Sequence, residues 1–344
     1  MIWTLSLAVK STMVLAAASA GARALRRSSA SARHALWCLA LGCLVALPLM
    51  SAGLSSLGWS LWPASTPDAF RQLETAAWGL EGPQVPLGVD GAVPRGMSWW
   101  DWTLVAWLAG AGLALARLAV GSLLAALVVR RARPVTDPEW AALLHDSMTT
   151  LGVRGPVELR VSDAVDVPNV WGHRSPVVLL PEAAATWPEG QRRAILSHEL
   201  AHVVRHDSVT RTLAYVVRAL YWPHPLVWWA VSSLHREAER SCDDLVLRGG
   251  AAAPEYAQHL LGVARGLVRS SKRLLTASAG VERSRLGDRV LAVLDAHQDR
   301  RVPTRRGIAL VGSAALLVIA ALTVADPAAT RNRTGSPRPQ ASAE

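Results

Sequence analysis

Four long apolar stretches interrupt the polar sequence and are the most regular feature of the chain. Each approaches or exceeds the roughly 20 residues that an α-helix needs to cross a bilayer. The first contains Lys10, the third contains Arg117, and the fourth is short. The pattern predicts transmembrane helices at about residues 2–20, 35–54, 104–125 and 307–324.

The first stretch has a second interpretation, because the Ala-Ser-Ala segment at 18–20 resembles a signal-peptide cleavage site. A signal peptide carries its basic residues before its apolar core, whereas the arginines of segment 21–34 follow it. A retained span is therefore favoured.

The charges between the apolar stretches predict their orientation by the positive-inside rule. Segment 21–34 has four arginines and no acidic residue, so we expect it in the cytoplasm. Segment 55–101 carries five acidic residues against two arginines and is expected to be an external loop. Arginines also follow the third stretch and precede the fourth. We therefore expect a multi-pass plasma-membrane protein with external N- and C-termini and a cytoplasmic domain at 130–306.

The pattern between residues 130 and 306 changes to that of a folded domain. Strands precede a set of helices, which indicates an α+β domain with few strands in a predominantly α chain. The apolar segment 221–229 carries three tryptophans and either touches the inner leaflet or packs in the core. The expected elements are strands at 157–161 and 177–180 and helices at about 136–151, 188–205, 208–221, 225–249, 255–268 and 284–295.

Composition agrees with a membrane protein, because 51% of the 344 residues are hydrophobic and the mean hydropathy is +0.23. The net charge of +10 could indicate nucleic-acid binding. The basic residues instead collect at the ends of spans, where anionic lipid attracts them. We therefore expect the lipid bilayer as a partner and no direct contact with nucleic acid. Two of the three cysteines, Cys38 and Cys43, lie in a span, which argues against a disulfide framework.

Segment 195–204 contains an HExxH motif in an apolar helical frame. Residues four apart share a helix face, so His198 and His202 can present both imidazoles to one metal ion. Glu199 can take a proton from a metal-bound water. Two imidazoles with an open position suit catalytic Zn²⁺, so the motif indicates a zinc peptidase.

A catalytic zinc site needs a third protein ligand, and the charged helix around residues 235–244 offers one. Glu239 and Asp243 are four residues apart and share a face. We expect Glu239 to bind the metal and Asp243 to accept a hydrogen bond from a ligand histidine. Glu237 is the runner-up ligand, and Cys242 is interpreted as a small buried neighbour.

Several motifs together resemble the BlaR/MecR-type antirepressor metallopeptidases, integral membrane zincins of bacterial signalling. The resemblance covers nearly all of the chain and implies a gluzincin-like domain. It also implies Zn²⁺ held by His198, His202 and Glu239, with Glu199 as general base. The motifs are Ser197–His202 with Arg205 and Asp207, Trp222–Pro225, Glu239–Asp243 and Gly172–Pro181.

The resemblance implies a cytosolic protein substrate, a winged-helix repressor of the BlaI/MecI type, with self-cleavage as a further reaction. Beta-lactam receptors of the family carry a large penicillin-binding sensor domain after the fourth span. Segment 325–344 is too short for such a sensor, so we expect it to be a disordered external tail. Loop 55–101 or a partner protein would then sense the stimulus. A homodimer is compatible with this organisation.

Two other functions fit parts of the pattern. HtpX-like and prenyl-protease membrane zincins of protein quality control also have HExxH and ExxxD, but the three preceding spans favour the antirepressor group. A non-catalytic membrane transducer with structural zinc would not need Glu199. We expect strand 177–180 to pair with an extended substrate at a sheet edge. Three histidines are candidate oxyanion donors, none of them assigned: His173, His206 and His224.

Overall fold

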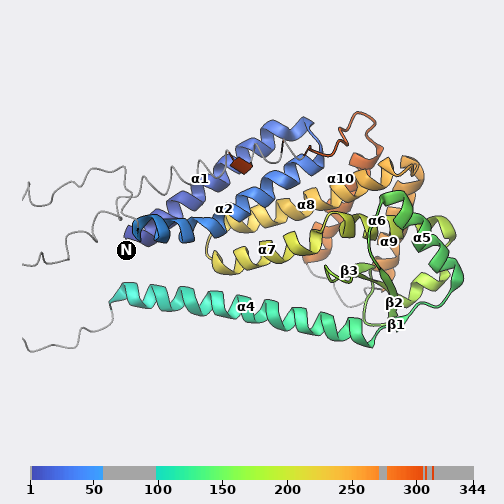
Figure 1. The fold of residues 1–344 in the computed structure, drawn as a ribbon, viewed down its shortest axis with the longest axis horizontal. Coiled ribbons are helices and arrows are strands. Elements are labelled where there is room, and N and C mark those ends of the chain that lie inside the picture. The colour runs from blue at the N-terminus through green and yellow to red at the C-terminus, as the bar shows by residue number, and fades with distance from the viewer. Residues whose placement is uncertain (1, 57–97, 271–276, 305–306, 308–311, 314–344) are drawn as a thin grey trace, which may run out of the picture.

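The structure is a computed structural model that describes residues 2–56, 98–270, 277–304, 307 and 312–313. Long helices lie side by side at one end, and a small sheet with shorter helices forms the other end (Figure 1). The predicted fourth span at 307–324 and tail at 325–344 lie almost wholly outside the described residues, as does most of the predicted loop 55–101.

Three long helices correspond to the first three predicted spans. They are α1 (Ile2–Ala24), α2 (Ala30–Ser56) and α4 (Trp99–Arg131), and a short 3₁₀ turn (Leu25–Arg27) joins the first two. In the described part of the chain, two helical segments are long and apolar enough to cross a membrane, Ala30–Met50 and Trp99–Arg131. Helix α4 is longer than the predicted 104–125. The four-span topology as a whole stays a prediction.

A four-stranded sheet follows α4, in the order β1-β2-β4-β3. Its strands are β1 (Arg133–Pro134), β2 (Glu158–Ser162), β3 (Asn169–Trp171) and β4 (Val177–Pro181). Strands β2 and β4 are parallel, with Leu159 opposite Val178, whereas β1 and β3 are antiparallel to their neighbours. The prediction of strands at 157–161 and 177–180 is confirmed, and the two flanking strands were not foreseen.

The expectation that strand 177–180 offers an edge to substrate is wrong. Strand β4 lies between β2 and β3, so its backbone groups pair within the sheet on both sides. All five of its residues are buried, in keeping with an interior strand. An extended peptide would have to pair with another strand.

Six α-helices complete the described part of the domain, and each predicted helix of the region has a counterpart. Helix α5 begins at the N-cap Asp137, whose side chain accepts a hydrogen bond from the Glu139 amide, and ends at the left-handed Gly152. At the corner between α6 and α7, His206 is also left-handed, with φ of 55°. The helices are α5 (Pro138–Leu151), α6 (Glu189–Val204), α7 (Asp207–Leu220), α8 (Pro225–Arg248), α9 (Ala253–Ser270) and α10 (Ala277–Leu294).

Two apolar clusters position the helices that carry the HExxH and ExxxD motifs. One joins the sheet and α5 to α6 and includes Trp140, Val178 and Leu196. The other joins α1 and α2 to α7 and α8 and includes Trp37 and Leu234. Helix α8 packs against α1 and α2 along one side, and it also contacts α6, where Val246 and Ala194 share a third cluster.

Candidate metal centre

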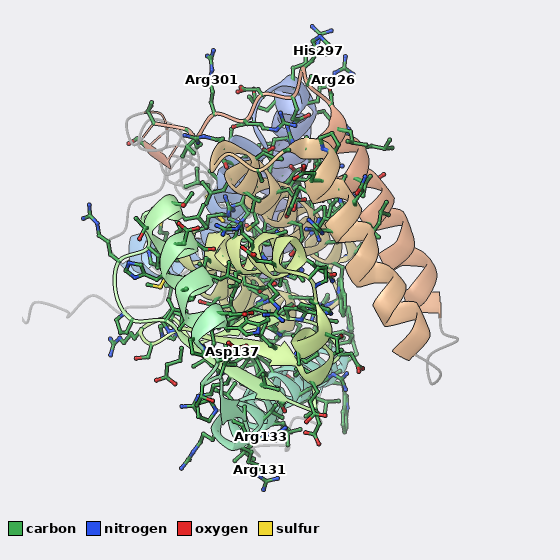
Figure 2. The ribbon with its side chains drawn as sticks, turned by 90° about the vertical axis from the view of Figure 1, so that its right-hand side faces the viewer. Arg26, Arg131, Arg133, Asp137, His297 and Arg301 are labelled. Atoms are coloured by element: carbon green, nitrogen blue, oxygen red, sulfur yellow. The ribbon has the colours of Figure 1, made fainter. Side chains whose placement is uncertain are left out.

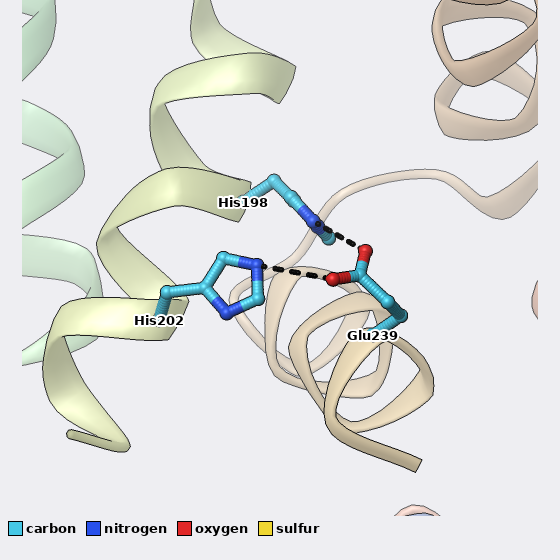
Figure 3. A group of neighbouring side chains, drawn as sticks. All are labelled: His198, His202 and Glu239. Atoms are coloured by element: carbon cyan, nitrogen blue, oxygen red, sulfur yellow. Dashed lines mark ion pairs between the residues drawn. The ribbon is translucent and has the colours of Figure 1, made fainter. Parts of the chain in front are cut away.

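Helix α6 presents the two histidines of the HExxH motif on one face (Figure 3). The ring centroids of His198 and His202 are 5.0 Å apart, and the ring planes are nearly perpendicular. Leu196 and Leu200 on this helix are fully buried, which fixes the helix against its neighbours. Glu199 is also buried, next to the first histidine. The local geometry is the one that the motif predicted.

Helix α8 brings Glu239 to the same point. Its two carboxylate oxygens lie 3.5 Å from Nε2 of His198 and 3.6 Å from Nε2 of His202 (Figure 3). One ligand atom from each of the three residues lies within 4.8 Å of the others. The structure therefore brings together the three side chains that the sequence suggested as metal ligands.

The donor set fits a catalytic zinc ion. Two neutral imidazoles and one carboxylate are a usual protein ligand set for Zn²⁺ and leave a position for water. Both imidazoles face Glu239 with Nε2, the atom that would coordinate. Their Nδ1 atoms point away and make hydrogen bonds elsewhere, which is the arrangement that sets the tautomer of a ligand histidine.

Nδ1 of His198 is held by a buried pair of residues. It lies 3.0 Å from the hydroxyl oxygen of Tyr256 and 3.2 Å from Oδ1 of Asp243. Tyr256 in turn donates its hydroxyl hydrogen bond to Asp243 over 2.8 Å. The placement of Asp243 is the predicted one. Tyr256, from α9, was not foreseen.

Arg289, from α10, is a second residue that the sequence did not reveal. Its Nε and Nη2 donate to the two oxygens of Asp243 at 2.9 and 2.7 Å. Its Nη1 lies 3.0 Å from Oε2 of Glu239, and its Nη2 lies 3.4 Å from Nε2 of His198. One guanidinium thus connects both acidic residues of the ExxxD motif.

Nδ1 of His202 is held by residues from its own stretch of chain. It lies 2.9 Å from Oδ2 of Asp207, and that same oxygen accepts a hydrogen bond from Nε of Arg205 at 3.1 Å. The sulfur of Cys242 lies 3.2 Å from this Nδ1. Cys242 is fully buried, as a small neighbour was expected to be.

Cys242, His202 and Asp207 form a second group whose ligand atoms are close enough to hold a metal ion. Burial raises the pKa of the Cys242 thiol well above its usual value, and the charge of Asp207 raises it further. In this group the His202 atom nearest to the other two is Nδ1, which already hydrogen-bonds to Asp207. The first group offers two imidazoles that face one carboxylate with Nε2. The first group is therefore the better metal site.

The acidic groups around the histidines carry strongly shifted pKa values. Burial alone would raise the pKa of Glu239, but the hydrogen bond to His198 and the charge of Arg289 hold it well below its usual range. Asp243 behaves in the same way, with Arg289 as the dominant partner. For Asp207, burial is outweighed by His202 and Arg205, and the pKa falls to about 2. These carboxylates are ionised at neutral pH and favour a cation between them.

His198 is shifted in the opposite direction. Burial and the charge of Arg289 lower its pKa, but the hydrogen bonds to Asp243 and Glu239 outweigh them and raise it to about 9. Without a metal ion this imidazole is therefore protonated at neutral pH. A metal ion would replace that proton.

The remaining candidate residues lie away from the histidine pair or at the surface. Glu237, the runner-up ligand, forms an ion pair with Arg33 of α2 at 2.9 Å. His224 lies at the far end of α8, with Nε2 3.0 Å from the hydroxyl of Thr12. His173 and His206 are exposed.

Most of the chain is similar to one family of known proteins. The family described as BlaR1 peptidase M56 matches residues 2–293. The Regulatory protein BlaR1 of Bacillus licheniformis is 25% identical over 142 residues, which cover 41% of this chain and 24% of that protein. The Methicillin resistance mecR1 protein of Staphylococcus aureus (strain Mu50 / ATCC 700699) is 28% identical over 93 residues, or 27% of this chain and 16% of that protein. The mecR1 protein of Staphylococcus epidermidis gives the same values. The matched segments span about a quarter or less of these relatives.

Proposed function

The chain belongs to the BlaR1 peptidase M56 family, and from this premise we propose that it is a membrane-embedded zinc metalloendopeptidase. Membership implies a metallopeptidase. The assignment as a zinc-dependent endopeptidase is supported above all by one observation, the convergence of His198, His202 and Glu239 beside the buried Glu199. In this proposal the first three hold the metal ion and the fourth is the general base.

The residues of the centre have distinct tasks in peptide hydrolysis. Bound zinc would supply Lewis acidity, polarising the scissile carbonyl and acidifying the attacking water. Glu199 accepts a proton from that water on its carboxylate and delivers it to the leaving amine. Asp243 and Asp207 each keep Nδ1 of one histidine protonated, so that the lone pair of Nε2 faces the metal position.

The proposed location is the plasma membrane, with four spans, external termini and a cytoplasmic domain at 130–306. Figure 2 looks onto the domain end of the molecule and shows Arg26 and Arg301 extending from one edge and Arg131 and Arg133 from the opposite edge. Arginines that gather at this end support a cytoplasmic orientation by the positive-inside rule.

The proposed substrate is a cytosolic repressor of the BlaI/MecI type, cleaved in signal transduction. The names of the matched relatives, a regulatory protein and methicillin resistance proteins, support a regulatory role. The proposal extends to this chain what the family resemblance implied. It gives the peptidase a protein substrate that can reach the cytoplasmic domain.

The test uses the full chain in proteoliposomes that are loaded with zinc, together with a purified winged-helix repressor. Wild type is expected to cleave the repressor, and Glu199→Gln is expected to bind zinc but not to cleave. Glu189→Gln, at an exposed site on the same helix, is the matched control and should cleave normally. Cleavage by Glu199→Gln at the wild-type rate would contradict the mechanism. Cleavage of unfolded membrane proteins in place of the repressor would point to a quality-control peptidase.

A further inference from the structure

The hairpin made of α7, α8 and the connecting residues 221–224 lies between the candidate spans (Figure 1). The closed end of the hairpin, residues 221–224, is hydrogen-bonded to two of these helices. Tyr221 donates its hydroxyl hydrogen bond to the carbonyl of Leu44 in α2, at 2.7 Å. Trp222 donates its indole N–H to the carbonyl of Trp107 in α4, at 3.2 Å.

The closed end also meets the third long helix. His224 Nε2 lies 3.0 Å from the hydroxyl of Thr12, in the middle of α1. On the α4 side, Gly110 allows the close approach, because a Cβ at this position would lie 2.5 Å from the ring of Trp222. The hairpin is therefore built into the helices that the proposal places in the membrane.

The depth of the closed end follows from the arginines that mark the cytoplasmic ends of α1 and α2. Arg23 follows Thr12 by 11 residues, which is about 16 Å of helix rise. Arg33 precedes Leu44 by 11 residues, again about 16 Å. Both helices place the closed end about halfway through a hydrocarbon core of roughly 30 Å.

Helix α4 gives the same depth when Arg117, inside the predicted span 104–125, is taken as its cytoplasmic boundary. Arg117 follows Trp107 by 10 residues, or about 15 Å. Trp99 and Arg117 are 18 residues apart, so the segment between them is about 27 Å long and close to the thickness of the core. The rest of α4 extends beyond this level along the domain, where the Val129 carbonyl accepts a hydrogen bond from Arg160.

The hairpin has the composition that an apolar surrounding requires. Residues 219–234 contain no Asp, Glu, Lys or Arg. Arg218, just before this segment, places its guanidinium 4.8 Å from the ring centre of Tyr215 and 4.9 Å from that of Trp228. Two aromatic faces thus cover the hairpin charge that is nearest to the closed end in sequence.

The polar atoms at the closed end are bonded within the protein. The indole N–H of Trp228 donates to the carbonyl of Trp222 at 2.8 Å, and the bonds of Tyr221 and Trp222 go to the spans. Such internal bonds are what lipid demands, since it offers no hydrogen-bond partner. Nδ1 of His224 is buried and is the exception among the described groups at this end. Apolar side chains at this end are not covered by the protein, because Trp228 is 50% exposed and Pro223 is also exposed.

We propose that the α7–α8 hairpin is inserted into the cytoplasmic leaflet, with its closed end near the bilayer midplane and Trp228 and Pro223 in contact with lipid acyl chains. This inference rests on the proposed membrane location of α1, α2 and α4. It also changes the proposed cytoplasmic domain at 130–306, because the half of the hairpin next to residues 221–224 would lie in the bilayer and not in the cytoplasm.

The inserted hairpin links the spans to the metal centre. Glu239 lies on α8, 14 residues beyond Pro225, or about 21 Å from the closed end. It therefore lies just on the cytoplasmic side of Arg23 and Arg33, which are about 16 Å from the closed end. The neighbouring Glu237 forms its ion pair with Arg33 at that level. A displacement of α1, α2 or α4 therefore reaches a metal ligand through one continuous helix.

The test measures depth by spin labels on the full chain in phospholipid nanodiscs. Trp228→Cys and Pro223→Cys each receive a nitroxide, and electron paramagnetic resonance compares its accessibility to oxygen and to a water-soluble nickel chelate. Two positions calibrate the scale. Leu108→Cys lies on α4, 54% exposed and next to Trp107, and Ala142→Cys lies on the exposed side of α5. The unsubstituted chain measures labelling of the native cysteines.

The expected result is an oxygen-favouring accessibility for both hairpin labels, equal to that of Leu108→Cys and opposite to that of Ala142→Cys. If the Trp228→Cys substitution disturbs the fold, the label at Pro223→Cys still measures the depth of the hairpin. If Leu108→Cys reports lipid while both hairpin labels report water, the insertion is wrong and the membrane location of α4 stands. If Leu108→Cys itself reports water, the proposed location fails and the insertion fails with it.

Discussion

His198 and His202 lie four residues apart on α6, yet their Nδ1 atoms meet partners of different origin. Those of His198 come from two other helices, with Asp243 on α8 and Tyr256 on α9, and Arg289 of α10 holds Asp243 in turn. The main partner of His202 is Asp207, five residues along the chain. One imidazole is therefore oriented by other helices, and the other mainly by its own stretch of chain, with Cys242 of α8 as a further contact.

The difference predicts unequal consequences when each support is removed. Loss of the His202 support removes one bonded oxygen, Oδ2 of Asp207, which also accepts from Arg205 and from the buried thiol of Cys242. Loss of the His198 support removes both bonded oxygens of Asp243, which connect α8 to α9 and α10 as well as orienting an imidazole. We therefore expect the metal affinity to depend on both sides, and the stability of the domain to depend mainly on the His198 side.

The largest effect is expected for Asp243→Ala. It leaves the partly buried Arg289 without its main partner, which costs about 3–5 kcal/mol, and it releases His198, which lowers zinc affinity about 10–100-fold. Asp207→Ala is the matched variant and should lose similar zinc affinity with a smaller drop in melting temperature. Zinc titration against a chelator and thermal unfolding measure the two quantities. Equal drops in melting temperature would remove the distinction between the two supports.

The pH dependence of zinc binding sharpens the same comparison. Because the pKa of His198 is about 9 without metal, zinc must displace one proton at any lower pH. Zinc affinity should therefore rise about tenfold per pH unit from pH 7 and level off above about pH 9. Asp243→Asn removes a charge that raises this pKa and should move the plateau to lower pH. An affinity that is flat from pH 7 to 9 would exclude a protonated His198.

A smaller effect is expected for Arg289→Lys. An ammonium group cannot replace the fork that reaches Asp243 and Glu239 together, so we expect about a tenfold loss of zinc affinity. Arg300→Lys is the control. Arg300 forms an ion pair with Asp244, which lies on α8 like Glu239, but Arg300 does not contact a proposed metal ligand. Zinc titration of the two variants should separate them. Similar affinities in both would mean that Arg289 does not position the ligands.

The smallest effect is expected for Tyr256→Phe. It removes one hydroxyl that bridges His198 and Asp243 and leaves the carboxylate in place, so the loss should be about 1 kcal/mol, or roughly fivefold in zinc affinity. Tyr215→Phe, whose ring lies beside Arg218 in α7, is the aromatic control. A loss as large as that of Asp243→Ala would show that Tyr256 does more than bridge.

The sequence was most informative where spacing is local. The spacing of four residues in the HExxH motif and in the Glu239–Asp243 pair was enough to predict which side chains share a helix face, because helix geometry alone decides this. Helix ends were also predictable, as at Asp137 and Gly152, where caps are encoded in one or two residues.

The rest depended on contacts between distant segments. Arg289 lies 46 residues beyond Asp243 and no motif joins them, so only the packing of α10 against α8 brings them together. The interior position of β4 depended on β3, a three-residue strand too short to show a pattern. The depth of the α7–α8 hairpin depended on its contacts with three long helices, although its charge-free segment was visible in the sequence.

The most direct test of the metal centre is X-ray absorption at the zinc edge of the purified chain. Coordination by His198, His202 and Glu239 predicts a first shell of nitrogen and oxygen at about 2.0–2.2 Å with histidine multiple scattering. The neighbouring group that contains Cys242 would instead add sulfur at about 2.3 Å. A shell without sulfur that is lost in Glu239→Ala would support the account. A zinc–sulfur signal that survives this substitution would contradict it.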